Sequence, residues 1–161
     1  MKTFRTIIAF AFFLMTAAAG ADSQGKVQPE PTDPKKACRG FKPHELCFDR
    51  PRDGVARVEY LSEPFYAVIL KTSERCMVTE EERLQAQALF PRSKVFSKRL
   101  QCDDKIEENI DYTNVDSKFG FLAVYAGTTL EEAKKRLAEV NATGRFPGAN
   151  IRKMQAKLVY P

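Results

Sequence analysis

Residues 119–160 decide the fold: FGFLAVYAGTTLEEAKKRLAEVNATGRFPGANIRKMQAKLVY. The stretch opens with an apolar, aromatic-rich run of strand length, Phe119–Ala126, which Gly127 ends. Gly144 and the Pro147-Gly148 pair supply a helix stop and a turn, and Ile151–Tyr160 has the composition of a further strand. The order strand, helix, strand is therefore predicted within about forty residues.

The middle of this stretch has the pattern of an amphipathic helix. Thr128-x-x-Glu131 has the spacing of a capping box, in which the two side chains satisfy backbone N–H groups at a helix start. Apolar residues then recur at steps of three and four and form one helix face: Leu130, Ala133, Leu137 and Val140.

The N-terminus has the features of a cleavable secretory signal over residues 1–21. Lys2 and Arg5 precede an apolar run, Ile7–Met15, and small residues with an Ala19-x-Ala21 pattern follow it. The run is shorter than the roughly 20 apolar residues of a membrane-spanning helix. We therefore expect a periplasmic or secreted protein that begins near Asp22 and keeps no stable membrane anchor.

About 140 residues then remain, which is the size of one domain. Removal of Lys2 and Arg5 lowers the formal net charge from +5 to +3. Acidic residues are interspersed with the basic ones, unlike the basic stripe of a nucleic-acid-binding protein. Binding of nucleic acid is not expected.

Two segments precede the predicted sheet. Residues 22–36 are polar and contain three prolines, which is typical of a short flexible leader. Residues 37–64 hold apolar side chains without a sustained period, with a possible edge strand at Gly54–Tyr60. We interpret this second segment as an extension, pinned by a disulfide, that packs on the main domain at residues 65–161.

Four cysteines remain after export: Cys38, Cys47, Cys76 and Cys102. An even number in an exported chain predicts two disulfides, and three pairings are possible. Cys38–Cys47 would close a short loop. Cys76–Cys102 would join the segments that follow two parallel strands, which are predicted at Phe65–Lys71 and Lys94–Gln101. Zinc is the alternative, but the sequence has no C-x-x-C and His44 is its one histidine. No metal or other cofactor is expected.

The same strand–helix–strand order occurs earlier in the chain. Phe65–Lys71 is a nearly continuous apolar run, Thr79-x-x-Glu82 is a second capping box before a helix that ends by Phe90, and Lys94–Gln101 is a plausible strand. Residues 103–118 form a polar connection with a possible helical turn at 105–110. The whole order predicts an α+β, ferredoxin-like βαββαβ fold, in which two helices back one face of a four-stranded antiparallel sheet.

The two repeats resemble the SPOR domain, a small module of the bacterial envelope. The resemblance rests mainly on FLAVYAG, TTLEEAKKRLAEV and ANIRKM, and secondarily on FYAVILKTS with the helix that follows it. It covers Phe65–Tyr160. It implies a non-catalytic domain that binds peptidoglycan, with a preference for glycan strands stripped of stem peptides.

Strand alternation assigns a candidate glycan-binding surface to the sheet face opposite the helices. If Leu122 and Val124 face the helices, the side chains of the opposite face would form an apolar centre with a cationic margin: Ile69, Lys71, Phe121, Tyr125 and Arg152. Aromatic rings suit the apolar faces of sugars, and cations suit carboxylates. Alternatively, residues 38–64 fold across this face and make its aromatics part of the core. An error of one residue in register would exchange the two faces.

Other functions have less support in the sequence. Single-stranded RNA binds a similar sheet face in another family, but Phe119-Gly-Phe121 lacks the flanking signature of that family. No hydrolase or phosphate-binding motif is present, and adjacent Glu107 and Glu108 do not face each other on a helix. A hydrolase that uses His44 is the weakest alternative. The second hypothesis is a small disulfide-stabilised exported protein that binds another envelope or secreted protein.

Overall fold

A computed structural model describes residues 24–28, 38–50, 58–74, 77–98, 110–116 and 118–159. Several predicted features lie outside the described residues: the signal at residues 1–21, the Cys76–Cys102 bridge, and the Glu107-Glu108 pair.

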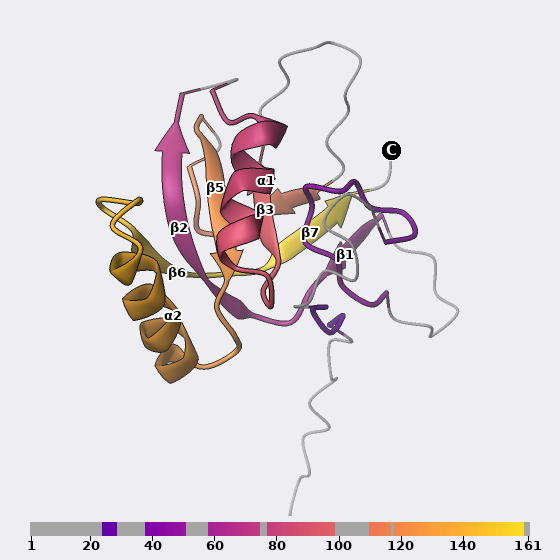
Figure 1. The fold of residues 1–161 in the computed structure, drawn as a ribbon. Coiled ribbons are helices and arrows are strands. Elements are labelled where there is room, and N and C mark those ends of the chain that lie inside the picture. Colours follow the sequence, from indigo (N-terminus) through magenta and orange to yellow (C-terminus); the bar gives the residue numbers. More distant parts are fainter. Residues whose placement is uncertain are drawn as a thin grey trace, which may run out of the picture.

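The chain folds as a mixed α+β protein, which confirms the predicted class (Figure 1). Its larger sheet is antiparallel, with the strand order β3-β5-β2-β6. The elements of this sheet and its helices are β2 (Phe65–Ser73), α1 (Glu80–Leu89), β3 (Val95–Lys98), β5 (Gly120–Tyr125), α2 (Leu130–Ala142) and β6 (Asn150–Met154).

A second, three-stranded sheet was not expected from the sequence. Its order is β1-β7-β4, and its strands are β1 (Glu59–Leu61), β4 (Ile110–Tyr112) and β7 (Ala156–Val159). The single strand predicted at residues 151–160 is therefore wrong: it divides at Gln155 into β6 and β7. Gln155 is held at this break because its N–H donates to Thr113 Oγ1 and its side-chain amide donates to the carbonyl of Ser62. Ile110, expected in a helical turn, instead begins β4.

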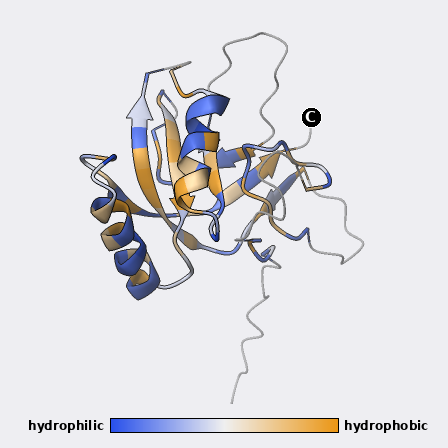
Figure 2. Cartoon of the chain, in the orientation of Figure 1, coloured by the Kyte–Doolittle hydropathy of each residue, from blue (hydrophilic) through white to orange (hydrophobic). Residues whose placement is uncertain are grey.

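Both helices pack on one face of the larger sheet. The buried cluster between them and the sheet contains Val68, Leu122 and Val124, as strand alternation predicts. The exposed sides of the helices are hydrophilic, whereas the central strands are apolar (Figure 2). Leu130, the first residue of α2, was expected on the buried helix face but is exposed.

Capping boxes start both helices. Thr79 and Glu82 form the predicted box of α1. In α2 the box lies one residue later than predicted, because Thr129 and Glu132 are the pair that closes it. Gly127, which precedes the box, has φ 95°, and a Cβ there would lie 2.5 Å from Glu132 Oε2. The glycine therefore allows the glutamate to fold back over the helix start.

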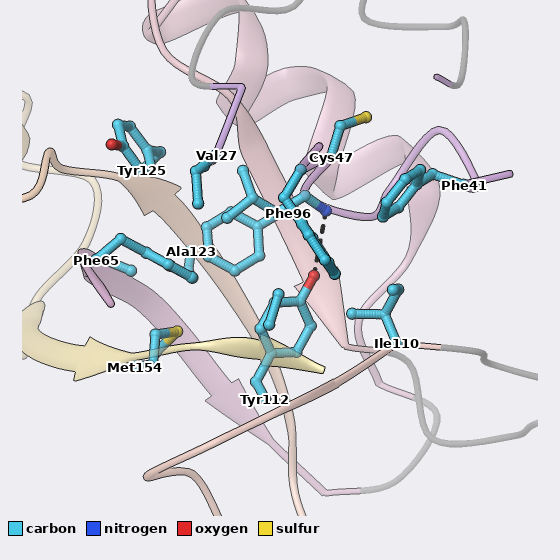
Figure 3. Packing of buried hydrophobic residues seen from close by; sticks show 14 of the residues in the cluster. Val27, Phe41, Cys47, Phe65, Phe96, Ile110, Tyr112, Ala123, Tyr125 and Met154 are labelled. Carbon is cyan, nitrogen blue, oxygen red and sulfur yellow. Dashed lines mark hydrogen bonds between the residues drawn. The ribbon is translucent and has the colours of Figure 1, made fainter. Parts of the chain in front are cut away.

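The face opposite the helices is covered by the protein itself. Two groups of side chains pack on it to form a second buried cluster: Ile110, Tyr112, Ala156 and Leu158 from the small sheet, and Phe41, Leu46 and Phe48 from residues 38–50. Figure 3 shows Tyr112 beneath Phe96, with its hydroxyl accepting a hydrogen bond, 3.2 Å long, from the backbone N–H of Leu46. We call residues 38–50 the roof segment.

The roof segment is held by the predicted Cys38–Cys47 disulfide, which is confirmed. Residues 24–28 lie against it and differ from the flexible leader predicted for residues 22–36. Gly25 forms a bridge with Ser62, and Val27 forms one with Phe48. Val27 is buried because its side chain joins the cluster beneath the roof segment. No helix in the described part of the chain has the length and apolar character needed to cross a membrane.

Candidate functional site

The predicted glycan-binding surface is not exposed. Ile69, Phe121 and Tyr125 are only 5, 3 and 9% exposed, and all three belong to the cluster beneath the roof segment and the small sheet. Strand alternation placed them on the correct face, but the expectation that this face is open is wrong. Phe65 and Phe96 pack between them, with the Phe65 and Tyr125 rings 5.8 Å apart. The aromatic side chains are therefore core.

Lys71 lies on the opposite face from the one predicted. A β-bulge between Ile69 and Lys71 shifts the register with β5. Lys71 therefore pairs with Leu122, which faces the helices, rather than with Phe121. The Lys71 ammonium consequently reaches α1, where it lies 2.6 Å from Glu82 Oε1 and donates to the carbonyl of Met77. Hydrogen bonds from Lys71 and from Thr79 hold the pKa of Glu82 below its usual value.

Arg152 is exposed, as predicted, and it lies at the margin of the covered face. Its Nε donates to Asn150 Oδ1 at 3.2 Å. Three of the predicted residues, Ile69, Phe121 and Arg152, contribute to a hollow of about 330 Å³ that also involves Asp116 and Phe119. The structure thus brings these three together at the rim of the sheet. Tyr125 contributes to a different hollow, and burial raises its pKa to about 12.

A larger groove, of about 700 Å³, lies on the helix side between α1 and the turn at residues 145–148. Its apolar lining comes from the sheet, from α1 and from the turn: Leu70, Leu122, Ala86, Leu89 and Phe146. Lys71, Glu82 and Arg145 supply its charged lining. A concave apolar surface with a few polar groups is the usual form of a binding site.

The two hollows meet at the end of β2. Both are lined by Ile69, Thr72 and Asn150, although one lies on the helix side of the sheet and the other on the covered side. The pairing of β6 with β2 ends at Asn150 and Ile69, so residues 70–73 of β2 have no neighbouring strand on that side within the described part of the chain. Figure 1 shows this end of β2 extending past the turn that leads into β6. We call residues 70–73 the open edge.

The other edge of the sheet is closed. The Val95 N–H donates to Gln87 Oε1, and the Val95 carbonyl accepts from Arg83, whose side chain is fully buried. The Ser97 N–H donates to the carbonyl of His44 in the roof segment. We call β3, with these partners, the closed edge.

Two buried charged groups lie where the roof segment meets the closed edge. Lys94 donates to the carbonyl of Pro43 at 2.7 Å, and Glu45 accepts from the Lys42 N–H at 2.6 Å. Burial lowers the pKa of Lys94 to about 8 and raises the pKa of Glu45. Such shifts also occur in purely structural clusters.

His44 is buried in the roof segment, with its backbone carbonyl bound to Ser97. Among the described residues, no group of three or more histidine, cysteine, aspartate or glutamate side chains could hold a metal ion.

Ile69 and Lys71 of the groove lining were among the predicted site residues, and the others were missed in the sequence. Phe146 gave one usable signal, because an aromatic residue between Gly144 and Pro147-Gly148 in a turn suggests that the turn packs on something. In the structure, the centre of its ring lies 6.2 Å from that of Phe90, the C-cap residue of α1. Arg145, beside it, gave no signal that separates it from other surface arginines.

Comparison of the chain with profiles of known protein families, with curated proteins and with solved structures found no match. The SPOR resemblance and the peptidoglycan binding that it implies therefore remain predictions.

Proposed function

We propose that this protein is an exported, non-catalytic module, stabilised by a disulfide, that binds another envelope or secreted protein. The signal-like residues 1–21 and the cysteine pair support export. The sheet and helices also support a ferredoxin-like βαββαβ unit, because β5 lies between β2 and β3, as the third strand of such a unit lies between the first two.

One observation favours a protein partner over a glycan. The aromatic floor on which a glycan strand would lie is packed beneath the roof segment and the small sheet, so its rings do not form an exposed surface along which a glycan strand could lie. The groove between α1 and the turn at 145–148 remains accessible instead. Its apolar lining could bury one or two hydrophobic side chains of a partner, and its polar rim could form hydrogen bonds with the partner's backbone.

Site-specific photocrosslinking in the cells that make the protein tests this proposal. A benzoylphenylalanine at Leu89, in the groove, should give a discrete protein adduct. The same group at Val58, which is 71% exposed and does not line the groove, should not. Absence of an adduct at Leu89, combined with sedimentation of the protein with purified peptidoglycan sacculi, would overturn the proposal in favour of glycan binding.

A further inference from the structure

The hydrogen-bonding direction of each residue in β2 follows from its neighbours. Tyr66 bonds through both its N–H and its carbonyl to the loop end of β5, and the Tyr125 N–H donates away from β2, to Lys94. Alternation from these points directs the backbone groups of Lys71 and Ser73 toward β5. Thr72, between them, directs its N–H and carbonyl away from β5, toward the open edge.

Among the described residues, Thr72 therefore has no partner for the donor and the acceptor that it directs toward the open edge. No described residue accepts a hydrogen bond from the Thr72 N–H, because β6 ends its pairing at Ile69. An unpaired strand edge of this kind is a template for an additional strand. The bulge beside it, at Ile69 to Lys71, is a feature often found next to binding sites.

The hollows on the two faces determine what kind of segment fits. Side chains of an extended segment point alternately to opposite faces of the sheet that it joins. A strand added beside Thr72 would direct one set of side chains into the groove lined by Leu89 and Phe146, and the other set into the hollow lined by Phe119 and Phe121. A helix could occupy the groove but could not fill both hollows.

Charge around the open edge favours acidic residues in the segment. Arg145 lines the groove, where Lys71 and Glu82 pair with each other, and Arg152 lines the opposite hollow, where the Asp116 carboxylate accepts from the Lys118 N–H. Neither guanidinium forms an ion pair with any described carboxylate, and Asn150 is the one described partner of the Arg152 side chain. Carboxylates could therefore form charge-assisted hydrogen bonds with both.

We infer that the partner binds as an extended acidic–apolar segment, which adds a short strand to the open edge at Thr72 and places alternate side chains in the two hollows. This inference rests on the proposed function, because it describes how the same groove is used. Backbone hydrogen bonds supply affinity in this mode, and the hollows supply sequence preference.

Selection of displayed random heptapeptides on the purified protein tests the inference. Enriched peptides should carry apolar residues at alternate positions together with Asp or Glu. A synthetic copy of an enriched peptide should bind Thr72→Pro at least about tenfold more weakly, because proline removes the donor and blocks the edge. Lys135→Met, at an exposed position of α2 outside the lining of both hollows, should bind within about threefold of the unchanged protein.

The outcomes separate this inference from the proposed function. If binding is lost in Leu89→Lys but not in Thr72→Pro, the groove binds a partner but strand addition is wrong. If the enriched peptides show apolar spacings of three and four, strand addition is equally wrong, because that period belongs to a helix. If no peptide is enriched and sacculi bind the protein, both the inference and the proposed function fail.

Discussion

The two edges of the larger sheet differ in what completes them. At the closed edge, the backbone groups of β3 are bound by Gln87, Arg83 and the roof segment. At the open edge, β2 continues past the end of β6 with Thr72 unpaired among the described residues. Natural sheets usually protect both edges. On our proposal, one side of this sheet serves stability and the other binds a partner.

The largest expected effect comes from opening the closed edge. Gln87→Leu removes the acceptor of the Val95 N–H and the donor to the carbonyls of Phe90 and Ser93. Two buried groups, the Val95 N–H and the Ser93 carbonyl, would lose their partner, whereas the Phe90 carbonyl keeps the Ser93 N–H. We expect the free energy of unfolding to fall by about 4 kcal/mol in urea titration. Gln85→Leu, on the exposed side of α1, should change it by less than about 0.5 kcal/mol.

A matched pair of proline substitutions tests the asymmetry of the edges itself. Ser97→Pro removes a donor that binds the His44 carbonyl, in a place with no room for the ring, and should cost at least about 3 kcal/mol. Thr72→Pro removes an unpaired donor and should cost less than about 1 kcal/mol. Similar losses in the two variants, measured by the same denaturation, would contradict the comparison.

The disulfide holds the roof segment that completes the closed edge. Replacement of Cys38 and Cys47 by serine should lower the free energy of unfolding by about 2.5 kcal/mol, because it frees a short loop in the unfolded chain. Exchange of the Ser97 amide proton should accelerate at the same time, whereas exchange at Thr72 should not change. An unchanged Ser97 rate would show that the roof segment stays in place without the disulfide.

Stability should depend on pH through Lys94, which fastens the roof segment at Pro43. The pKa of Lys94 is about 8 in the folded protein and 10.5 ordinarily, so between these values the unfolded chain binds more protons. The free energy of unfolding should therefore rise between pH 8 and 10.5, on the order of 1 kcal/mol. Arg83 adds to this lowering of the Lys94 pKa, whereas the Glu80 and Glu45 carboxylates oppose it.

Lys94→Met should remove this rise in thermal unfolding curves recorded across the interval. Lys135→Met, at an exposed position of α2, serves as the control and should leave the rise intact. A slope that persists in Lys94→Met would assign the pH dependence to other groups.

The smallest effect is expected beside the open edge. Lys71 and Glu82 form an ion pair whose side chains are 38 and 37% exposed. Lys71→Met should therefore lower the free energy of unfolding by less than about 1 kcal/mol, measured by thermal denaturation. A decrease of more than about 2 kcal/mol in the free energy of unfolding would show that this ion pair stabilises the fold as much as contacts at the closed edge do.

The α+β class could be predicted because local patterns carry it. The capping boxes at Thr79 and Thr129 start the two helices, and the apolar runs form β2 and β5. Local sequence pattern and the final fold therefore agree in these elements. The exact start of the second helix could not be predicted in this way. The adjacent threonines at 128 and 129 permit two capping boxes one residue apart. Short-range spacing does not decide between them.

The candidate site could not be predicted because it depends on long-range contacts. A bulge at Ile69 directs Lys71 to the helix side of the sheet, and no residue in this part of the sequence predicts a bulge. The division of the last strand at Gln155 depends on Thr113 and Ser62, which are distant in sequence. Arg83 and Gln87 face the sheet from α1, against the usual rule that the polar side of a helix faces solvent.

Residue-resolved hydrogen–deuterium exchange by NMR tests the central claim most directly, since it compares the two edges in one sample. The amide protons of Val95 and Ser97 should exchange slowly, and that of Thr72 should exchange at least about a hundredfold faster, because it lacks an acceptor. Equal protection at Thr72 and Ser97 in the isolated protein would contradict the account, because both edges would then be closed.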